Sequence, residues 1–212
     1  MRVSLKSLFV LELILTILLA RVARDHRDPV RALAAIEKLG GELHFSDGKY
    51  GRGFAKDWRP GESQVVGVRL RKCQNTDLRW LSALPELRWL DLRCTQISDA
   101  GLKHVAGLRH LRSLILDHTA VTSAGIEQLA GLTELQWLQL GDTQVDDAGL
   151  VHLGRMRKLA TLELYLTRVS DRGLVHLQKL PALDSLFVSG THVTPAGVQN
   201  LLAGLPNCHV AQ

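Results

Sequence analysis

The most constraining feature of this chain is a unit of 24 residues that repeats through most of its length. The segment "LDLRCTQISDAGLKHVAGL" runs from Leu90 to Leu108. At later steps of 24 residues it returns as "LILDHTAVTSAGIEQLAGL", "LQLGDTQVDDAGLVHLGRM", "LELYLTRVSDRGLVHLQKL" and "LFVSGTHVTPAGVQNLLAG". Each unit reads as a short strand, a turn and a short helix, which together are too small to bury their own leucines. A period in the twenties therefore predicts a solenoid in which neighbouring units cover one another.

Columns of similar residues through the units predict how each unit is built. Leu90 and Leu92 alternate inward along the strand, and Leu102 and Val105 lie at the i, i+3 spacing of one helix face. A threonine is predicted to hydrogen-bond the backbone of the turn, a short polar residue to cap the helix, and a glycine to let neighbouring units approach closely. The columns are Thr95, Thr119, Thr143, Thr167 and Thr191; Ser98, Thr122, Asp146, Ser170 and Thr194; and Gly101, Gly125, Gly149, Gly173 and Gly197.

The pattern Leu87-x-x-Leu90-x-Leu92-x-x-Thr95-x-Ile97 resembles the leucine-rich repeat, with threonine where the commonest form has asparagine. Over residues 66–210, "TQISDAGLKHVAGL", "TQVDDAGLVHL" and "TRVSDRGLVHL" are similar to the repeats of F-box-associated proteins and of the short planctomycete type. The N-terminal residues and "AIEKLGGELHF" favour the second group, and no F-box-like segment is recognised. The resemblance implies an α/β leucine-rich repeat solenoid with parallel strands on the concave face, short helices on the convex face and a helix-containing N-terminal cap. It also implies an interaction surface.

Four segments are expected along the chain. Residues 1–20 form a signal peptide or membrane anchor, residues 21–64 an N-terminal cap, residues 65–204 one degenerate and five full repeats, and residues 205–212 a C-terminal cap. In the cap we expect a helix that Asp28 caps and Gly40 ends, then a short strand at "ELHFS" and a loop. The degenerate repeat is predicted to place Val66, Val68, Cys73, Leu78 and Leu81 in the repeat columns.

The N-terminal segment leaves the location of the chain open between several possibilities. Its apolar run from Leu8 to Ala20 contains Glu12 and is shorter than the roughly 20 residues of a full membrane span. That length favours a signal peptide, but the small-x-small cleavage pattern is poor, so an uncleaved anchor is an alternative, and a buried helix is a third. We expect a cell-envelope protein, tethered or secreted. Several arginines follow the apolar run, and basic residues favour the cytoplasmic side of a membrane. A location on the cytoplasmic side is therefore also open.

Charge along the chain favours a protein partner over nucleic acid. The formal net charge is +5, but residues 113–154 hold six Asp and Glu and no Lys or Arg. A reader of nucleic acid usually presents one coherent basic face, so we expect none, and membrane contact only through residues 1–20. Cys73 and Cys208 fall in core columns and are predicted to be buried thiols, which leaves Cys94 as the exposed one.

The predicted binding surface is the concave side of the sheet. Four aromatic residues of the repeats all fall in the strand positions that point away from the core, among polar residues. Trp, Tyr and Arg are enriched where binding energy concentrates, although aromatics also stack along sheets because they pack well there. The candidate residues are Trp89, Asp91, Arg93, Ile115, Asp117, Trp137, Gln139, Glu163, Tyr165 and Phe187.

Catalytic, metal and cofactor sites are not predicted. His104, His152 and His176 share a helix column and could line a zinc site, but a solvated helix face explains them, since no further ligand joins them. Asp117, His118 and Asp142 lie on adjacent turns and could hold a divalent cation, but also suit ordinary turns. We therefore expect no enzyme. The preferred function is a monomeric, non-catalytic protein-binding scaffold, and the alternative is a structural envelope protein that binds itself or the wall.

Overall fold

The computed structural model describes residues 28–51 and 63–212. The predicted signal peptide or anchor at residues 1–20, the start of the cap segment and most of its predicted loop lie outside these ranges. Within them, no helix combines the length and the apolar character that crossing a membrane requires.

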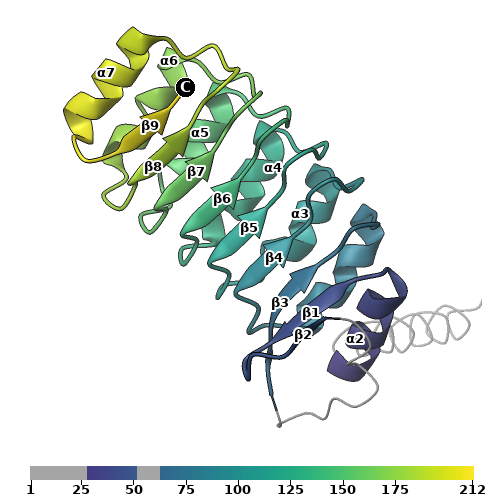
Figure 1. Ribbon diagram of the computed structural model, residues 1–212. Helices are drawn as coiled ribbons and strands as arrows, with labels where there is room; N and C mark the ends of the chain where they lie inside the picture. Colours follow the sequence, from purple (N-terminus) through teal and green to yellow (C-terminus); the bar gives the residue numbers. More distant parts are fainter. Residues whose placement is uncertain (1–27, 52–62) are drawn as a thin grey trace, which may run out of the picture.

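One nine-stranded sheet runs through the described chain, in the order β2-β1-β3-β4-β5-β6-β7-β8-β9 (Figure 1). Every pair from β3 to β9 is parallel, whereas β1 is antiparallel to both of its neighbours. The period predicts the parallel part. Each repeat takes the chain along a strand and back through a helix, so the next strand starts beside the previous one and runs in the same direction. The strands are β1 (Glu42–Phe45), β2 (Tyr50–Gly51), β3 (Val65–Arg69), β4 (Trp89–Asp91), β5 (Ser113–Ile115), β6 (Trp137–Gln139), β7 (Thr161–Glu163), β8 (Ser185–Phe187) and β9 (His209–Ala211).

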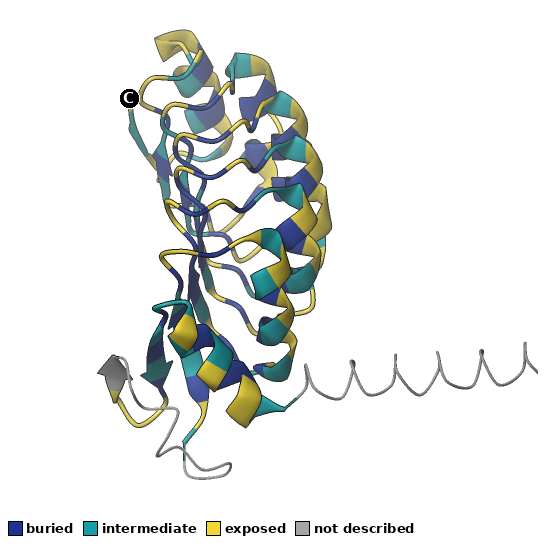
Figure 2. Cartoon of the chain, turned by 90° about the vertical axis from the view of Figure 1, so that its right-hand side faces the viewer, coloured by how far each residue is buried: buried dark blue, intermediate teal, exposed yellow. Residues whose placement is uncertain are grey.

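Short helices cover one face of the sheet and leave the other uncovered by helices (Figure 2). We call the uncovered face the concave face and the helix side the convex face. The helices turn their exposed residues outward and their buried residues toward the sheet. They are α2 (Pro29–Lys38), α3 (Asp99–Val105), α4 (Ser123–Gln128), α5 (Asp147–Leu153), α6 (Asp171–Leu174) and α7 (Pro195–Gly204), with 3-10 helices η1 (Asn75–Ala83), η2 (Leu129–Gly131) and η3 (Leu177–Lys179).

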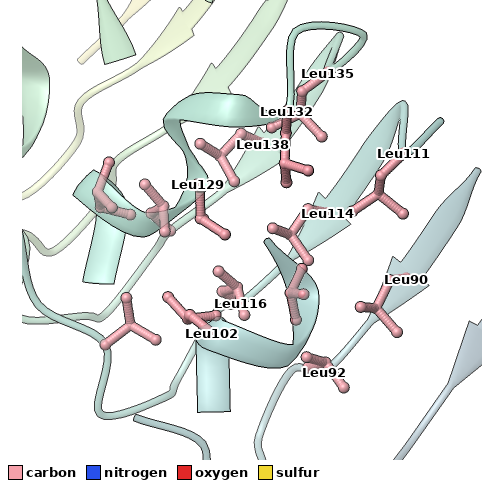
Figure 3. Packing of buried hydrophobic residues seen from close by; sticks show 14 of the residues in the cluster. Leu90, Leu92, Leu102, Leu111, Leu114, Leu116, Leu129, Leu132, Leu135 and Leu138 are labelled. Atoms are coloured by element: carbon pink, nitrogen blue, oxygen red, sulfur yellow. The ribbon is translucent and has the colours of Figure 1, made fainter. Parts of the chain in front are cut away.

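The core is a continuous stack of leucines between the two layers (Figure 3). Leu90 pairs in register with Leu114, and Leu114 with Leu138, so one strand column runs straight through the stack. These three side chains have no exposed area, and the helix residue Leu102 is equally buried. Each unit thus covers the leucines of the next. The solenoid predicted from the period is therefore the observed fold.

Two predictions about the turns can be checked. Thr95 donates its hydroxyl to the carbonyl of Leu92 at 2.6 Å, and each other threonine of the column makes the same bond. Four of the five predicted helix caps accept a backbone N–H of their own helix. Ser98 is the exception: it makes no cap bond, and its hydroxyl accepts from Asn75 Nδ2 at 2.8 Å instead.

The N-terminal cap contains the predicted helix and strand, and one further strand. Asp28 accepts hydrogen bonds from Val30 N and Arg31 N at the start of α2, and Gly40 adopts a left-handed φ of 70° after its end. β1 follows at Glu42–Phe45, and β2 at Tyr50–Gly51 lies within the segment predicted as loop. A two-residue strand is too short to show alternation in the sequence, and it forms because β1 offers an unpaired edge.

The predicted register of the degenerate repeat is wrong on its strand. Val68 pairs with Leu90, whereas a constant period would have placed Val66 there. Val66 is partly exposed, Val68 is buried in the first leucine column, and Leu70 is buried beyond it. The helical part keeps the predicted spacing, with Cys73, Leu78 and Leu81 buried. The turn between β3 and η1 is therefore two residues shorter than the turn of a full repeat.

Candidate binding surface

The concave face of strands β4 to β8 carries three columns of side chains. The first two columns follow from the strand register, and the third lies two residues beyond the end of each strand. The columns are Trp89, Ser113, Trp137, Thr161 and Ser185; Asp91, Ile115, Gln139, Glu163 and Phe187; and Arg93, Asp117, Gly141, Tyr165 and Ser189. The four aromatic rings thus fall in three different columns and form no single stripe.

Strand alternation points the ten candidate side chains away from the core, but three of them are nevertheless buried. Asp91 has no exposed area, Asp117 is 4% exposed and Ile115 is 6% exposed. Trp137 and Arg93 are exposed, and the other five candidates are partly exposed. The inner side of a curved sheet brings neighbouring side chains together, so short residues are covered by longer ones. Strand alternation alone does not show this.

Asp91 is the centre of an ion-pair cluster rather than a free acidic group. Arg69 donates Nε to Asp91 Oδ2 at 2.8 Å, and Arg93 donates Nε to both carboxylate oxygens at 3.0 Å. The backbone N–H of Arg93 adds a third donor at 3.1 Å. A buried carboxylate is tolerated when it is paired in this way. Asp91 therefore orients the two arginines at the edge of the face.

Trp89 is packed into the N-terminal end of the sheet. Its ring lies edge-on to His44 at 4.7 Å between centroids, and the Arg69 guanidinium lies 5.4 Å from its centroid. A Cβ on Gly67 of the neighbouring strand would lie 2.9 Å from the ring. The ring thus fills the space that the glycine leaves, and for Trp89 the packing interpretation of the aromatic residues is the better one.

Tyr165 likewise packs on a glycine, at the centre of the face. A Cβ on Gly141 would collide with its ring, and the ring also lies edge-on to His118 at 6.4 Å. Burial and the nearby charges of Asp117 and Glu163 raise the pKa of Tyr165, so its hydroxyl keeps its proton. Glycines within strands are the sequence signal that could have revealed both packed rings.

Asp117 lies beneath this centre. It accepts the backbone N–H of Gly141 at 2.7 Å, and its charge is near enough to raise the pKa of Tyr165. Burial raises the pKa of Asp117, partly opposed by the Gly141 bond, and the charge of Glu163 raises it further. Gln139 in turn donates Nε2 to Glu163 at 2.5 Å. The central polar residues are therefore held in place by one another.

Trp137 differs from the other aromatic residues of the face. It is 46% exposed, and its register partners on the two neighbouring strands are the small residues Ser113 and Thr161. Neither neighbour can cover an indole ring. A large apolar side chain thus lies nearly half exposed on a rigid sheet. Sequence reasoning had not included Ser113 and Thr161 in the candidate surface.

The candidate metal residues are not brought together into a cluster. His118 Nδ1 lies 2.7 Å from Asp142 Oδ2 across two adjacent turns, at left-handed φ values of 55° and 50°. Among residues 28–51 and 63–212, no group of three or more His, Cys, Asp or Glu is placed to hold a metal ion. We therefore interpret the His118–Asp142 contact as a hydrogen bond that links two adjacent turns.

Comparisons with known proteins agree with this architecture. The family described as leucine rich repeat matches residues 85–145. A leucine-rich repeat protein of Leptospira interrogans superposes with a TM-score of 0.50 at 18% identity, covering 68% of this chain and 41% of that one. An internalin from Listeria monocytogenes gives 0.46 at 24% identity, covering 63% and 43%. The chain thus spans less than half the length of either. No curated protein matches.

One fold accounts for the repeat columns, the seven parallel strands and the matched family. These observations do not separate the planctomycete type from the F-box-associated type. The fold is a leucine-rich repeat solenoid, and residues 85–145 match the family described as leucine rich repeat.

Proposed function

We propose that this chain is a non-catalytic scaffold that binds a segment of a partner protein on its concave face. Leucine-rich repeat proteins typically serve as interaction surfaces rather than enzymes, which supports the general class. The observation that carries the specific proposal is Trp137, whose indole is 46% exposed at the middle of the face. Large aromatic side chains on rigid surfaces are frequent anchors of protein interfaces.

The surroundings of Trp137 suit an anchor of this kind. Ser113 and Thr161 beside it are short, so a partner side chain can reach the exposed part of the ring. Gln139 and Glu163 in the next column are held by their mutual hydrogen bond, so little side-chain entropy remains to be lost on binding. Trp89 and Tyr165 are already packed on glycines. They would extend the contact area without acting as free anchors.

The test compares the native chain with Trp137→Ala and Val151→Ala as baits in quantitative affinity capture. Val151 is 40% exposed on α5 of the same repeat, on the opposite side of the solenoid. We expect a partner that the native chain and Val151→Ala retain equally and that Trp137→Ala retains at least tenfold less. Loss of the same partner from both variants, or from neither, would refute the concave-face proposal. Self-association that depends on Trp137 would instead support the structural alternative.

The proposed location is the cell envelope, on the basis of the apolar residues 8–20. Fractionation of cells that express the full chain or residues 21–212 would test it. We expect the full chain with the envelope or outside the cell, and the shorter chain in the cytosol. Equal distribution of the two would contradict the proposal.

A further inference from the structure

A basic hollow lies where the N-terminal cap meets the first repeats, and residues of α2, of β3 and of the turn after β3 line it. Figure 1 shows where these two elements lie in the fold. It consists of three adjoining cavities of about 470, 380 and 540 Å³, and all three are lined by Arg71. The cations that line the hollow are Lys38, Arg69, Arg71, Lys72 and Arg93.

The shortened turn of the first repeat accounts for the hollow. A full repeat places Cys94, Thr95 and Gln96 between its strand and its helix, and this segment lines one wall of the 470 Å³ cavity. The preceding turn, from Leu70 to Cys73, lacks two residues relative to it. The volume that those residues fill elsewhere in the stack therefore stays open, and Leu39 of the cap closes it only from one side.

The cations around the hollow are only partly neutralised. Arg69 and Arg93 share the buried Asp91, and Arg71 reaches Glu42 through one nitrogen at 3.3 Å while its side chain stays 60% exposed. A guanidinium has five N–H donors, so Arg71 keeps most of its donors for another acceptor. Neither Lys38 nor Lys72 makes an ion pair with another residue in the described ranges.

The groups that would repel an anion are already engaged. Asp77, the acid that lines the hollow, accepts the backbone N–H of Gln74 at 2.8 Å in a capping box. The last carbonyls of α2 point toward this end, but those of Ile36 and Glu37 accept from Gly41 N and Gly40 N. These acceptors are therefore already used, while Arg71 keeps free donors beside them.

We propose that the basic hollow binds a small phosphate-bearing anion. A phosphate group carries nearly two charges and several terminal oxygens, so it can accept from Arg71, Lys72 and Lys38 at once from different directions. A single carboxylate would satisfy one guanidinium and leave the others unpaired. The hollow lies at the N-terminal end of the repeats and shares Arg93 with the concave face, but it does not include Trp137, so the failure of one proposal can be told from the failure of the other.

Cys94 offers a direct readout, because it lines two of the three cavities and is the exposed cysteine of the three. The rate at which uncharged iodoacetamide alkylates Cys94 in the full chain would be followed by mass spectrometry. Inorganic phosphate, acetate and chloride would be compared at equal ionic strength. We expect phosphate to slow the reaction several-fold with saturation, and acetate and chloride to change it little.

The matched variants carry the same loss of two positive charges. Arg71→Gln with Lys72→Gln should weaken the protection by phosphate at least tenfold, whereas Arg157→Gln with Lys179→Gln, both exposed on later repeats, should leave it unchanged. Circular dichroism checks folding, and Lys38→Gln with Lys72→Gln replaces the first pair if that pair unfolds the chain. Equal protection by acetate, or protection that survives both hollow variants, would overturn the proposal.

Discussion

Gly125 lies so close to Asp99 of the preceding repeat that a Cβ on the glycine would collide with the Asp99 carboxylate. That carboxylate is held in place by Thr122, which donates its backbone N–H at 2.8 Å and its hydroxyl at 2.7 Å. Asp147 makes the same pair of bonds with Ser170, and Asp171 with Thr194. Three glycines of the column, Gly125, Gly173 and Gly197, make room for these acids, and Gly101 and Gly149 do the same for the polar side chains of Asn75 and Ser123. We call this row of polar contacts along the convex side the acid ladder.

Gly125→Ala should accordingly lower the free energy of unfolding by about 2 kcal/mol, because the new methyl group displaces Asp99 and meets Leu102. Denaturant unfolding would measure the change. Gly131→Ala is the matched control, since nothing lies within 4 Å of its Cβ position and its φ is not left-handed. It should be neutral or stabilising by about 0.5 kcal/mol. Equal losses in the two variants would contradict the ladder interpretation.

The periodic residues show how far sequence reasoning reaches. The leucine, threonine and glycine columns predicted the strands, the turns and the stacking direction, because a solenoid repeats one local geometry. The first repeat was misaligned because two residues are missing from its turn, and no period can show that. On the candidate surface, strand alternation placed the candidate residues on the concave face but missed the burial of Asp91 and Asp117. Their burial depends on long side chains from neighbouring strands.

Trp89 and Trp137 should behave differently, although they occupy the same column. Trp89→Ala should lower the free energy of unfolding by about 2 kcal/mol, since its ring packs on Gly67, His44 and Arg69. Trp137→Ala should change stability by less than about 0.5 kcal/mol, as expected for an exposed side chain. Chemical denaturation of both variants decides this. A large loss for Trp137→Ala would mean that its ring holds the sheet together.

Asp117→Asn should stabilise the fold at neutral pH. The folded-state pKa of Asp117 is raised by burial, so the folded chain binds a proton more tightly than the unfolded one, and stability falls as pH rises through this range. Asparagine can still accept from Gly141 N without carrying the charge. The gain should be absent at pH 3, where the native carboxyl is protonated, and present at pH 7. Asp184→Asn makes the same change of charge at an exposed position and should alter stability at pH 7 by less than about 0.5 kcal/mol.

Leu166 adopts a left-handed φ of 54° and is 57% exposed, so its backbone is strained without much burial in return. Leu166→Asn should raise the free energy of unfolding by about 1 kcal/mol, because asparagine tolerates this conformation better. Val175→Asn removes a comparably exposed apolar side chain at a φ of −60° and should give no gain. Thermal or denaturant unfolding of both would show whether backbone strain is the cause.

Deleting one whole repeat should leave a folded protein. The polar side chains that meet across the new junction should decide which repeat can be removed with the smaller loss of stability. Without residues 108–131, Gly107 joins Leu132, and each remaining repeat keeps its residues in the same columns. A deletion of 12 residues would instead place helix residues at strand positions and should abolish folding. Without residues 108–131, however, Asp99 faces Asp146 instead of Thr122, and two carboxylates meet.

Asp146→Ser in that shortened chain should therefore restore the missing pair of hydrogen bonds and raise its stability by about 1–2 kcal/mol. The same substitution in the native chain should give no gain, because Asp146 there accepts from Ser123 Oγ at 2.6 Å and caps α5. Deleting residues 132–155 brings Ser123 next to Ser170 and needs no such rescue. Unfolding curves of the two deletions, with and without the substitution, test the ladder directly. A gain from Asp146→Ser that is the same in the native and shortened chains would show that the acids of neighbouring repeats act independently.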